Sequence, residues 1–118
     1  MDSHTITLPY PQSLNTLYRF YRGHMILTKE GHTYKKTIGW MYKAAKLPKH
    51  PKGKDIAVLM NVWVPDKRRR DIMNLEKIVS DGLSGVAYDD DSQIVDYRIV
   101  KRGMLEGGKI ELTIACIN

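Results

Sequence analysis

Apolar side chains recur at two spacings along the chain, and the longer spacing predicts two helices. The first helix is expected over residues 28–45, where an apolar residue returns every three or four positions, as on one face of an amphipathic helix. The second is expected to begin at Ile72 and to stop at Gly85, after a stripe of leucine and valine at the same spacing. Both helices therefore have one apolar side to pack against a core.

The shorter spacing, strict alternation, predicts strands. Residues 55–64 are almost continuously apolar and rich in β-branched side chains, which is typical of a central strand covered on both faces. Residues 5–8, 94–100 and 109–117 alternate, and the last two are expected to pair as a hairpin with a long glycine-containing loop. The pattern predicts an α+β fold, a mixed sheet with two main helices packed on it, in one domain over residues 1–118.

Composition narrows the class of protein. The 118 residues are 42% hydrophobic and 27% charged, as in an ordinary soluble domain, and no apolar run approaches the ~18 residues of a membrane span. The N-terminus lacks the basic and apolar parts of a secretory signal. Cys116 is the only cysteine, so no internal disulfide forms, and it is expected to be a buried structural thiol. We therefore expect a cytoplasmic protein without a membrane partner.

Charge is distributed unevenly along the chain. The formal net charge is +6, and residues 1–60 carry ten basic and three acidic side chains, against nine and ten in residues 61–118. Four lysines gather in a loop with two prolines and a glycine, namely Lys46, Lys49, Lys52 and Lys54. A basic excess of this kind indicates a polyanionic partner, and nucleic acid is the leading candidate. The alternative at this point is a protein that is merely basic and soluble.

Acidic and basic side chains that suit phosphodiester chemistry occur in two stretches. Four consecutive cations precede Asp71 where a strand ends and a helix begins, and three aspartates at 89–91 precede another strand. Cations attract phosphates, while carboxylates bind Mg²⁺, which prefers hard oxygen ligands and can activate water. The histidines show no metal-ligand spacing, and no phosphate-binding glycine loop or nucleophile elbow is present. The pattern favours a nuclease and indicates no small-molecule substrate.

Each of these features also has an ordinary structural explanation. Asp71 is a suitable helix N-cap, the aspartates at 89–91 suit a polar turn, and the cations at 67–70 suit a solvated loop. Lys77 lies one turn before Asp81 and would pair with it on the helix surface. The combination of two acidic clusters, one beside a basic run, in a basic protein is what favours the functional interpretation.

These stretches resemble the RusA family of Holliday-junction resolvases, small dimeric Mg²⁺-dependent endonucleases of bacteria and their phages. The resemblance covers nearly the whole chain, through residues 6–11, 15, 18–19, 65–77, 90–98 and 108–114. Its most specific part is the central motif, in which arginines precede Asp-x-Asp-Asn-Leu-x-Lys. The resemblance implies a RusA-like fold, a homodimer, branched DNA as partner, and Mg²⁺ as cofactor with Mn²⁺ as a possible substitute.

The resemblance also assigns roles to individual residues. By position in the motifs, Asp71 and Asp91 are the implied metal-binding and catalytic aspartates, Asp90 is a neighbouring metal ligand, and Lys77 is the implied catalytic lysine. The motif asparagine and, because of their positive charge, the central cations and three lysines of the loop at 46–54 are expected to bind DNA. They are Lys67, Arg68, Arg69, Arg70, Asn74, Lys49, Lys52 and Lys54.

One position departs from the family motif. Its second aspartate falls on Met73, whose soft sulfur does not replace a carboxylate on Mg²⁺. Water can fill the vacant position, or Asp90, Asp89 or Glu76 can supply the oxygen, or cleavage is weak and the protein mainly binds junctions. We expect a Mg²⁺-dependent endodeoxyribonuclease that resolves four-way junctions by paired symmetric nicks. The alternative is a catalytically weak or inactive branched-DNA-binding protein on the same scaffold.

Overall fold

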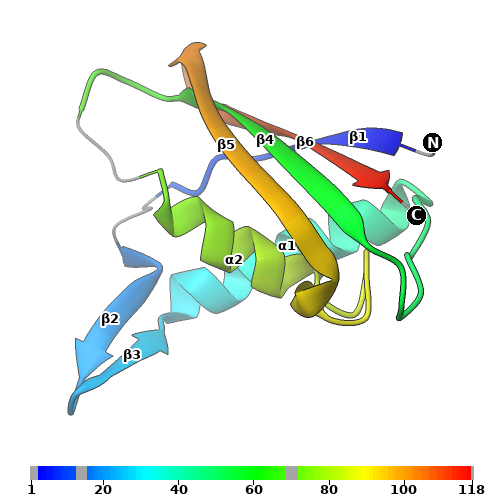
Figure 1. The fold of residues 1–118 in the computed structure, drawn as a ribbon. Coiled ribbons are helices and arrows are strands. Elements are labelled where there is room, and N and C mark those ends of the chain that lie inside the picture. Colours follow the sequence, from blue (N-terminus) through cyan, green and yellow to red (C-terminus); the bar gives the residue numbers. More distant parts are fainter. Residues whose placement is uncertain (1–2, 13–15, 69–71, 118) are drawn as a thin grey trace.

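The computed structural model describes residues 3–12, 16–68 and 72–117, which form a four-stranded sheet, two helices and a separate two-stranded ribbon (Figure 1). In chain order the elements are β1 (Ser3–Leu8), β2 (Tyr18–Tyr21), β3 (His24–Leu27), α1 (Lys29–Ala44), β4 (Ile56–Val64), α2 (Asn74–Leu83), the 3-10 helix η2 (Asp91–Gln93), β5 (Ile94–Met104) and β6 (Lys109–Cys116). This arrangement confirms the predicted α+β class, with a mixed sheet and two helices.

The sheet has the strand order β1-β6-β4-β5. β6 is antiparallel to both β1 and β4, whereas β4 and β5 are parallel and are joined through α2, because a parallel pair needs a long crossover connection. The prediction that residues 94–100 and 109–117 form a hairpin was wrong, since β4 lies between the two strands. Alternation identified the strands correctly but carried no information about their partners.

The core lies between the helices and one face of the sheet. Both helices pack on the same side (Figure 1), and the side chains at alternate positions of β4, from Ile56 to Val64, are buried there. The intervening side chains of β4, such as Leu59 and Trp63, are only half-buried on the opposite face. The expectation that this strand is covered on both faces was therefore wrong for the single chain.

The ribbon of β2 and β3 is joined to the body where α1 begins. Thr28 is the N-cap of α1 and accepts a hydrogen bond from the Gly31 amide, while its own amide donates to the Leu17 carbonyl at 2.9 Å. A Cβ on Gly31 would lie 2.4 Å from Leu27 Cδ1 and 2.5 Å from the Leu17 carbonyl oxygen. The missing side chain at Gly31 thus lets the base of the ribbon approach the helix.

Two further expectations concerned membrane-spanning helices and the burial of Cys116. Within the described ranges, neither helix is long and apolar enough to cross a membrane. Cys116 lies at the end of β6 and is half-buried, so it is less enclosed than the alternation suggested.

Candidate functional site

The three aspartates at 89–91 lie in a short turn between the end of α2 and the start of β5, here called the acidic turn. The chain reaches it directly from α2, because the Ala87 amide bonds to the Leu83 carbonyl and the Tyr88 hydroxyl bonds to the Ser80 carbonyl. The turn then enters η2 and continues into β5. The acidic turn is therefore positioned by the C-terminal end of α2 (Figure 1).

Gln93 connects the acidic turn to the lysine-rich loop from inside the protein. Its side chain is only 5% exposed, and its Oε1 accepts hydrogen bonds from the backbone amides of Asp89 at 2.9 Å and Asp90 at 3.1 Å. Its Nε2 donates to the carbonyl oxygens of Pro51 at 2.9 Å and Lys54 at 3.0 Å. One buried amide thus sets the position of both segments.

Asp89 makes a second connection between the same two segments. Its Oδ1 lies 2.8 Å from Lys49 Nζ, and its Oδ2 accepts a hydrogen bond from the Lys52 amide at 2.9 Å. The hydrogen bond from Lys49, followed by the one from the Lys52 backbone, lowers the pKa of this carboxyl. Both oxygens of Asp89 are already in use, which makes it a poor source for an additional metal ligand.

Asp90 and Asp91 are the other two exposed carboxylates of the acidic turn. Asp90 accepts a hydrogen bond from the Ser92 hydroxyl at 2.8 Å, and this bond is the main cause of the lowered pKa of its carboxyl. Asp91 is the first residue of η2. Asp90 is therefore ionised at neutral pH, as a ligand of a hard cation must be.

Lys77 lies in the first turn of α2, at the other end of that helix. Its Nζ is 3.7 Å from Asp81 Oδ2, so the surface pair considered as an alternative is present, and it also lies 5.9 Å from the centre of the Tyr18 ring. Burial, with the charges of Asp81 and Glu76, raises the pKa of Tyr18 to about 12. The tyrosine under Lys77 is therefore neutral and presents an aromatic face to the ammonium group.

The loop before α2 is described only in part. Lys67 and Arg68 are exposed, and Asp66 accepts the Arg68 amide at 2.9 Å and lies 3.5 Å from its guanidinium. Arg69, Arg70 and Asp71 lie outside the described residues, so the predictions on them stay predictions. The N-cap of α2 is Met73, which makes no side-chain capping bond.

The helix start also carries two of the residues assigned by resemblance. Asn74 is the first residue of α2 and is exposed. Met73 is 64% exposed, so the position where the family motif has an aspartate presents a thioether at the surface. The predicted DNA-binding residues that are described thus fall into two groups, one at the start of α2 and one in the lysine-rich loop beside the acidic turn.

These residues do not form one cluster within the described ranges. There, no three His, Cys, Asp or Glu side chains are close enough together to hold a metal ion. The acidic turn follows the C-terminal end of α2, whereas Lys77 lies near the N-terminal end of that ten-residue helix, about 15 Å long. The pairing of Asp71 with Asp91 stays a prediction.

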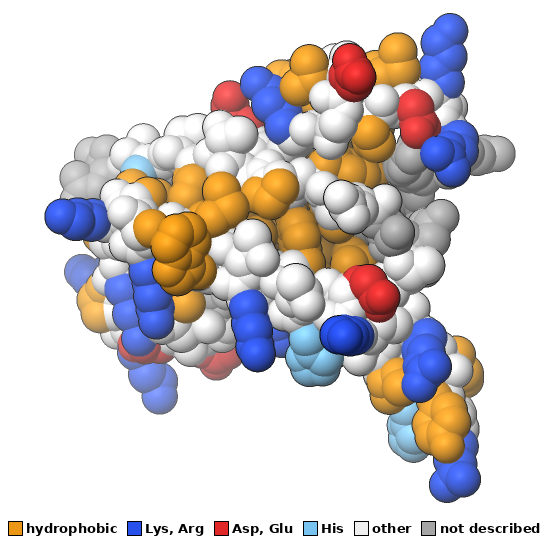
Figure 2. Space-filling view, turned by 180° about the vertical axis from the view of Figure 1, so that it is seen from behind, with side chains coloured by type: hydrophobic (Ala, Val, Ile, Leu, Met, Phe, Trp, Pro, Cys, Tyr) orange, Lys and Arg blue, Asp and Glu red, His pale blue; other side chains and the backbone are white. Residues whose placement is uncertain are grey.

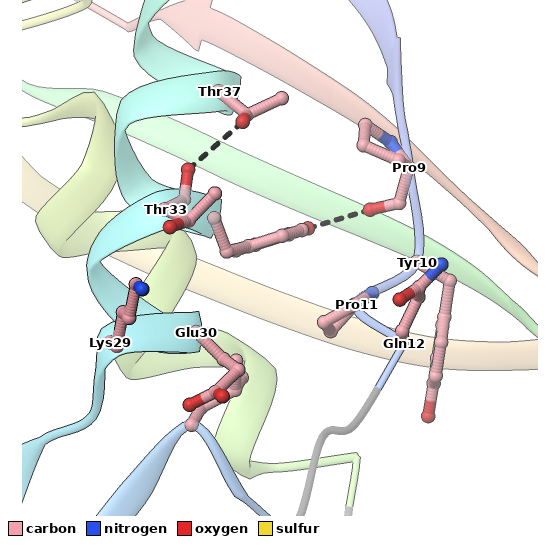
Figure 3. A pocket seen from close by; sticks show the side chains of 10 residues that line it. Pro9, Tyr10, Pro11, Gln12, Lys29, Glu30, Thr33 and Thr37 are labelled. Atoms are coloured by element: carbon pink, nitrogen blue, oxygen red, sulfur yellow. Dashed lines mark hydrogen bonds between the residues drawn. The ribbon is translucent and has the colours of Figure 1, made fainter.

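A hollow of about 540 Å³ lies elsewhere, between the segment after β1 and the first turns of α1 (Figure 3). Two of its lining residues are joined by a hydrogen bond, from the Tyr34 hydroxyl to the Pro9 carbonyl at 2.7 Å. None of the described residues predicted for the site lines this hollow. The candidate site is therefore an exposed surface, as a large polymeric substrate requires.

Comparison with known proteins identifies the family. The family model described as Endodeoxyribonuclease RusA matches residues 9–115. The chain belongs to this family. The crossover junction endodeoxyribonuclease RusA of Escherichia coli strain K12 is 40% identical to it, over 97% of this chain and 95% of the relative. Proteins of the same name from Shigella sonnei strain Ss046 and Enterobacteria phage 82 are 40% and 39% identical, with the same coverage.

Membership of the RusA family confirms the family and the enzyme class, an endodeoxyribonuclease, that the sequence indicated. The sequence interpretation nevertheless missed two features of the site. Gln93 was not recognised as a buried connector, because its partners are backbone groups 39 to 42 positions away at Pro51 and Lys54. The β2–β3 ribbon was also missed, although Arg22-Gly23 between its two strands is a suitable two-residue turn.

Proposed function

We propose that the protein is a divalent-metal-dependent endodeoxyribonuclease that resolves four-way DNA junctions by paired symmetric nicks. The observation that carries the proposal is the 40% identity to crossover junction endodeoxyribonuclease RusA across 97% of the chain. The related proteins of Escherichia coli and of a phage support action in the bacterial cytoplasm, and the match over residues 9–115 supports a single catalytic domain.

The carboxylates suit a hard divalent cation such as Mg²⁺, with Mn²⁺ as a substitute. Asp91 and Asp90 offer exposed oxygens at the end of a turn that Gln93 holds in place, and we assign Asp71 as the third ligand. Asp89 is excluded from this set because Lys49 and the Lys52 amide occupy its oxygens. Bound at these carboxylates, the ion supplies an activated water and stabilises charge on the phosphoryl group.

The basic residues bind the substrate and stabilise the transition state. Lys77 presents an ammonium group at the surface of α2, where it stabilises charge on the phosphate or on the leaving oxygen. Phosphates of the arms are held by Arg68, by its neighbours Arg69 and Arg70, and by Lys52 and Lys54 of the loop. Such contacts give affinity that falls steeply with salt.

We place two of these sites in a homodimer, because an isologous pair matches the two-fold symmetry of a four-way junction. In one chain the acidic turn and Lys77 lie toward opposite ends of α2. The proposed dimer therefore has two acidic turns and two such lysines, one of each from each protomer. Sedimentation equilibrium should give twice the mass of one chain. A monomer that still makes paired nicks would contradict this arrangement.

Cleavage of a labelled synthetic junction with Mg²⁺ tests the proposed activity. Asp71→Asn and Asp91→Asn should each abolish nicking while junction binding is retained, because each removes a charged ligand. Asp96→Asn is the matched control, since Asp96 is a carboxylate of the following strand that pairs with Arg98. Equal nicking by all of these proteins would refute the assignment of Asp71 and Asp91 as ligands, whereas a native protein that leaves the junction uncut would refute the proposed activity.

Met73 supports a second candidate, a branched-DNA-binding protein that cleaves weakly or not at all. Its thioether is exposed where the family motif has a carboxylate. Met73→Asp should raise the cleavage rate or the Mg²⁺ affinity if that oxygen is missing. Junction binding without any Mg²⁺-dependent strand break, in the native chain, would favour the second candidate over the first.

A further inference from the structure

The ribbon of β2 and β3, residues 18–27, projects from the body and is here called the arm. Figure 1 shows it extending away from both the sheet and the helices, and Figure 2 shows it as a separate protrusion of hydrophobic and basic side chains. Its base packs on the core through Tyr18 and Leu27, whereas Phe20, Tyr21 and Met25 are 69%, 51% and 60% exposed. The outer half of the arm therefore contributes little to the core.

One face of the arm is apolar along its whole length. Tyr18 lies opposite Leu27, and Phe20 lies opposite Met25 in the same register, so these four side chains share one face of the ribbon. At the base this face is covered by the core, and at the tip it is open to solvent. Two large apolar side chains directly opposite each other at an exposed tip form a wedge that no described part of the fold uses.

The rest of the arm is basic. It carries Arg19, Arg22 and His24 and contains no acidic residue. The Arg22 and Arg19 guanidinium carbons lie 5.3 and 6.0 Å from the centre of the Tyr21 ring, and Arg22 itself occupies the turn with a φ of 48°. Cations beside an apolar wedge complement a polyanion with stacked bases, which is the surface that DNA presents.

The arm begins beside the candidate catalytic lysine. The ring of Tyr18, at its base, lies 5.9 Å from Lys77 Nζ, and the arm extends outward from that contact. A DNA strand whose phosphate lies at Lys77 would meet the arm with its neighbouring nucleotides. The position of the arm, its positive charge and its apolar wedge all favour DNA as the partner that it contacts.

We infer that the arm inserts the side chains of Phe20 and Met25 against bases that are unstacked at the branch point, while Arg19 and Arg22 hold the flanking phosphates. The inference rests on the proposed function, since a four-way junction provides such bases and continuous duplex does not. Apolar wedges of this kind unstack base steps in other DNA-binding proteins, and aromatic rings then stack on the bases. The arm would thus distinguish junctions from duplex.

Binding measurements with Ca²⁺ in place of Mg²⁺ test the inference on a four-way junction and on a duplex of matched length. Phe20→Ala should weaken junction binding about tenfold and duplex binding less than about twofold, because one base stack is lost only where a base is open. Phe20→Trp should restore the junction affinity. Trp40→Ala is the matched control, because Trp40 is an equally exposed aromatic on α1.

Arg22→Gln separates the basic part from the wedge. It should weaken binding to both DNAs and lower the log–log salt slope by about 0.9, which is the loss of one phosphate contact. Unchanged slope and affinity would remove Arg22 from the interface, and with it the basic half of the inference.

Three results would overturn the inference. Equal junction affinity of native protein and Phe20→Ala, with Asp91→Asn still abolishing cleavage, would refute the arm and leave the proposed function intact. Dissociation of a dimer by Phe20→Ala in sedimentation would show that the wedge contacts a second copy of the chain instead. Native protein that neither binds nor cuts a junction would refute the proposed function itself, and the arm's role with it.

Discussion

The acidic turn and the arm are held to the rest of the molecule in opposite ways. The turn is connected to the lysine-rich loop from inside by Gln93 and from outside by Asp89, so the two segments are held together. Among the described residues, the arm contacts the core at its base, through Tyr18 and Leu27, and its tip is exposed. Ligands of a metal ion tolerate small displacements only, whereas an element that reaches into DNA has to extend from the body.

The difference in attachment indicates that metal binding and substrate recognition are assigned to separate parts of this domain. The part proposed to bind the ion is built on buried hydrogen bonds, and the part proposed to select the substrate has apolar and basic groups that the fold does not need. Changes to the first should impair cleavage and stability, whereas changes to the outer arm should impair only recognition.

Lys77 lies between the two regions, and its removal should have the largest effect on activity. Lys77→Ala should lower the cleavage rate about a hundredfold, the scale for losing one group that stabilises transition-state charge. Junction affinity should change less than about twofold. Rates are measured with saturating protein on a labelled junction, and Asp81→Asn, which removes only the partner at 3.7 Å, should cleave normally. Equal losses in both variants would mean that the ion pair is what matters.

Gln93→Ala should be the most destabilising change at the acidic turn. It leaves the amides of Asp89 and Asp90 and the carbonyls of Pro51 and Lys54 without their shared partner. We expect the free energy of unfolding to fall by about 3 kcal/mol, with reduced cleavage in the folded fraction. Urea denaturation measures the first effect, and a loss below about 1 kcal/mol would show that the turn is not held in this way.

Gly31→Ala should affect the base of the arm. The new methyl group would meet Leu27 Cδ1 at 2.4 Å and the Leu17 carbonyl oxygen at 2.5 Å, so the ribbon must shift from the helix. We expect a destabilisation of about 2 kcal/mol and weaker junction binding, with duplex binding preserved. Native stability together with native junction affinity would mean that the base of the arm need not be fixed.

The sequence predicts those features of the fold and site that depend on neighbouring residues, and it misses those that depend on residues far away in the chain. The periods that marked α1, α2 and β4 are properties of short segments, and those elements were found within a few residues of their bounds. The pairing of β5 was missed because its partner β4 lies far away in the chain, and Gln93 was missed for the same reason. The arm was missed because its two strands have only four residues each and residues 24–27 do not alternate. Asp71, Arg69 and Arg70, indicated by the charge pattern and by the resemblance, lie outside the described residues and stay predictions.

Acid should loosen the acidic turn before it affects the arm, although this effect is the smallest. The pKa of Asp89 is lowered by Lys49 and the Lys52 amide, so its stabilisation is present above the unfolded value of 3.8 and is lost as pH falls through the lower folded value. The amide resonance of Lys52 should report an inflection below pH 3.8, and that of Phe20 should stay flat. An inflection at or above 3.8 in the Lys52 resonance would contradict the sign of this shift.

The most direct test of the proposed metal site is to map the positions at which a bound redox-active ion cleaves the protein backbone. Fe²⁺ bound in place of Mg²⁺, with ascorbate and peroxide, generates radicals that cleave the chain next to the ion, and mass spectrometry identifies the fragment ends. If Asp71 and Asp91 share one ion, cuts should occur near both residues, should be suppressed by excess Mg²⁺ and should both be lost in Asp91→Asn. Cuts near only one of the two stretches, or cuts near Asp71 that persist in Asp91→Asn, would contradict a shared ion.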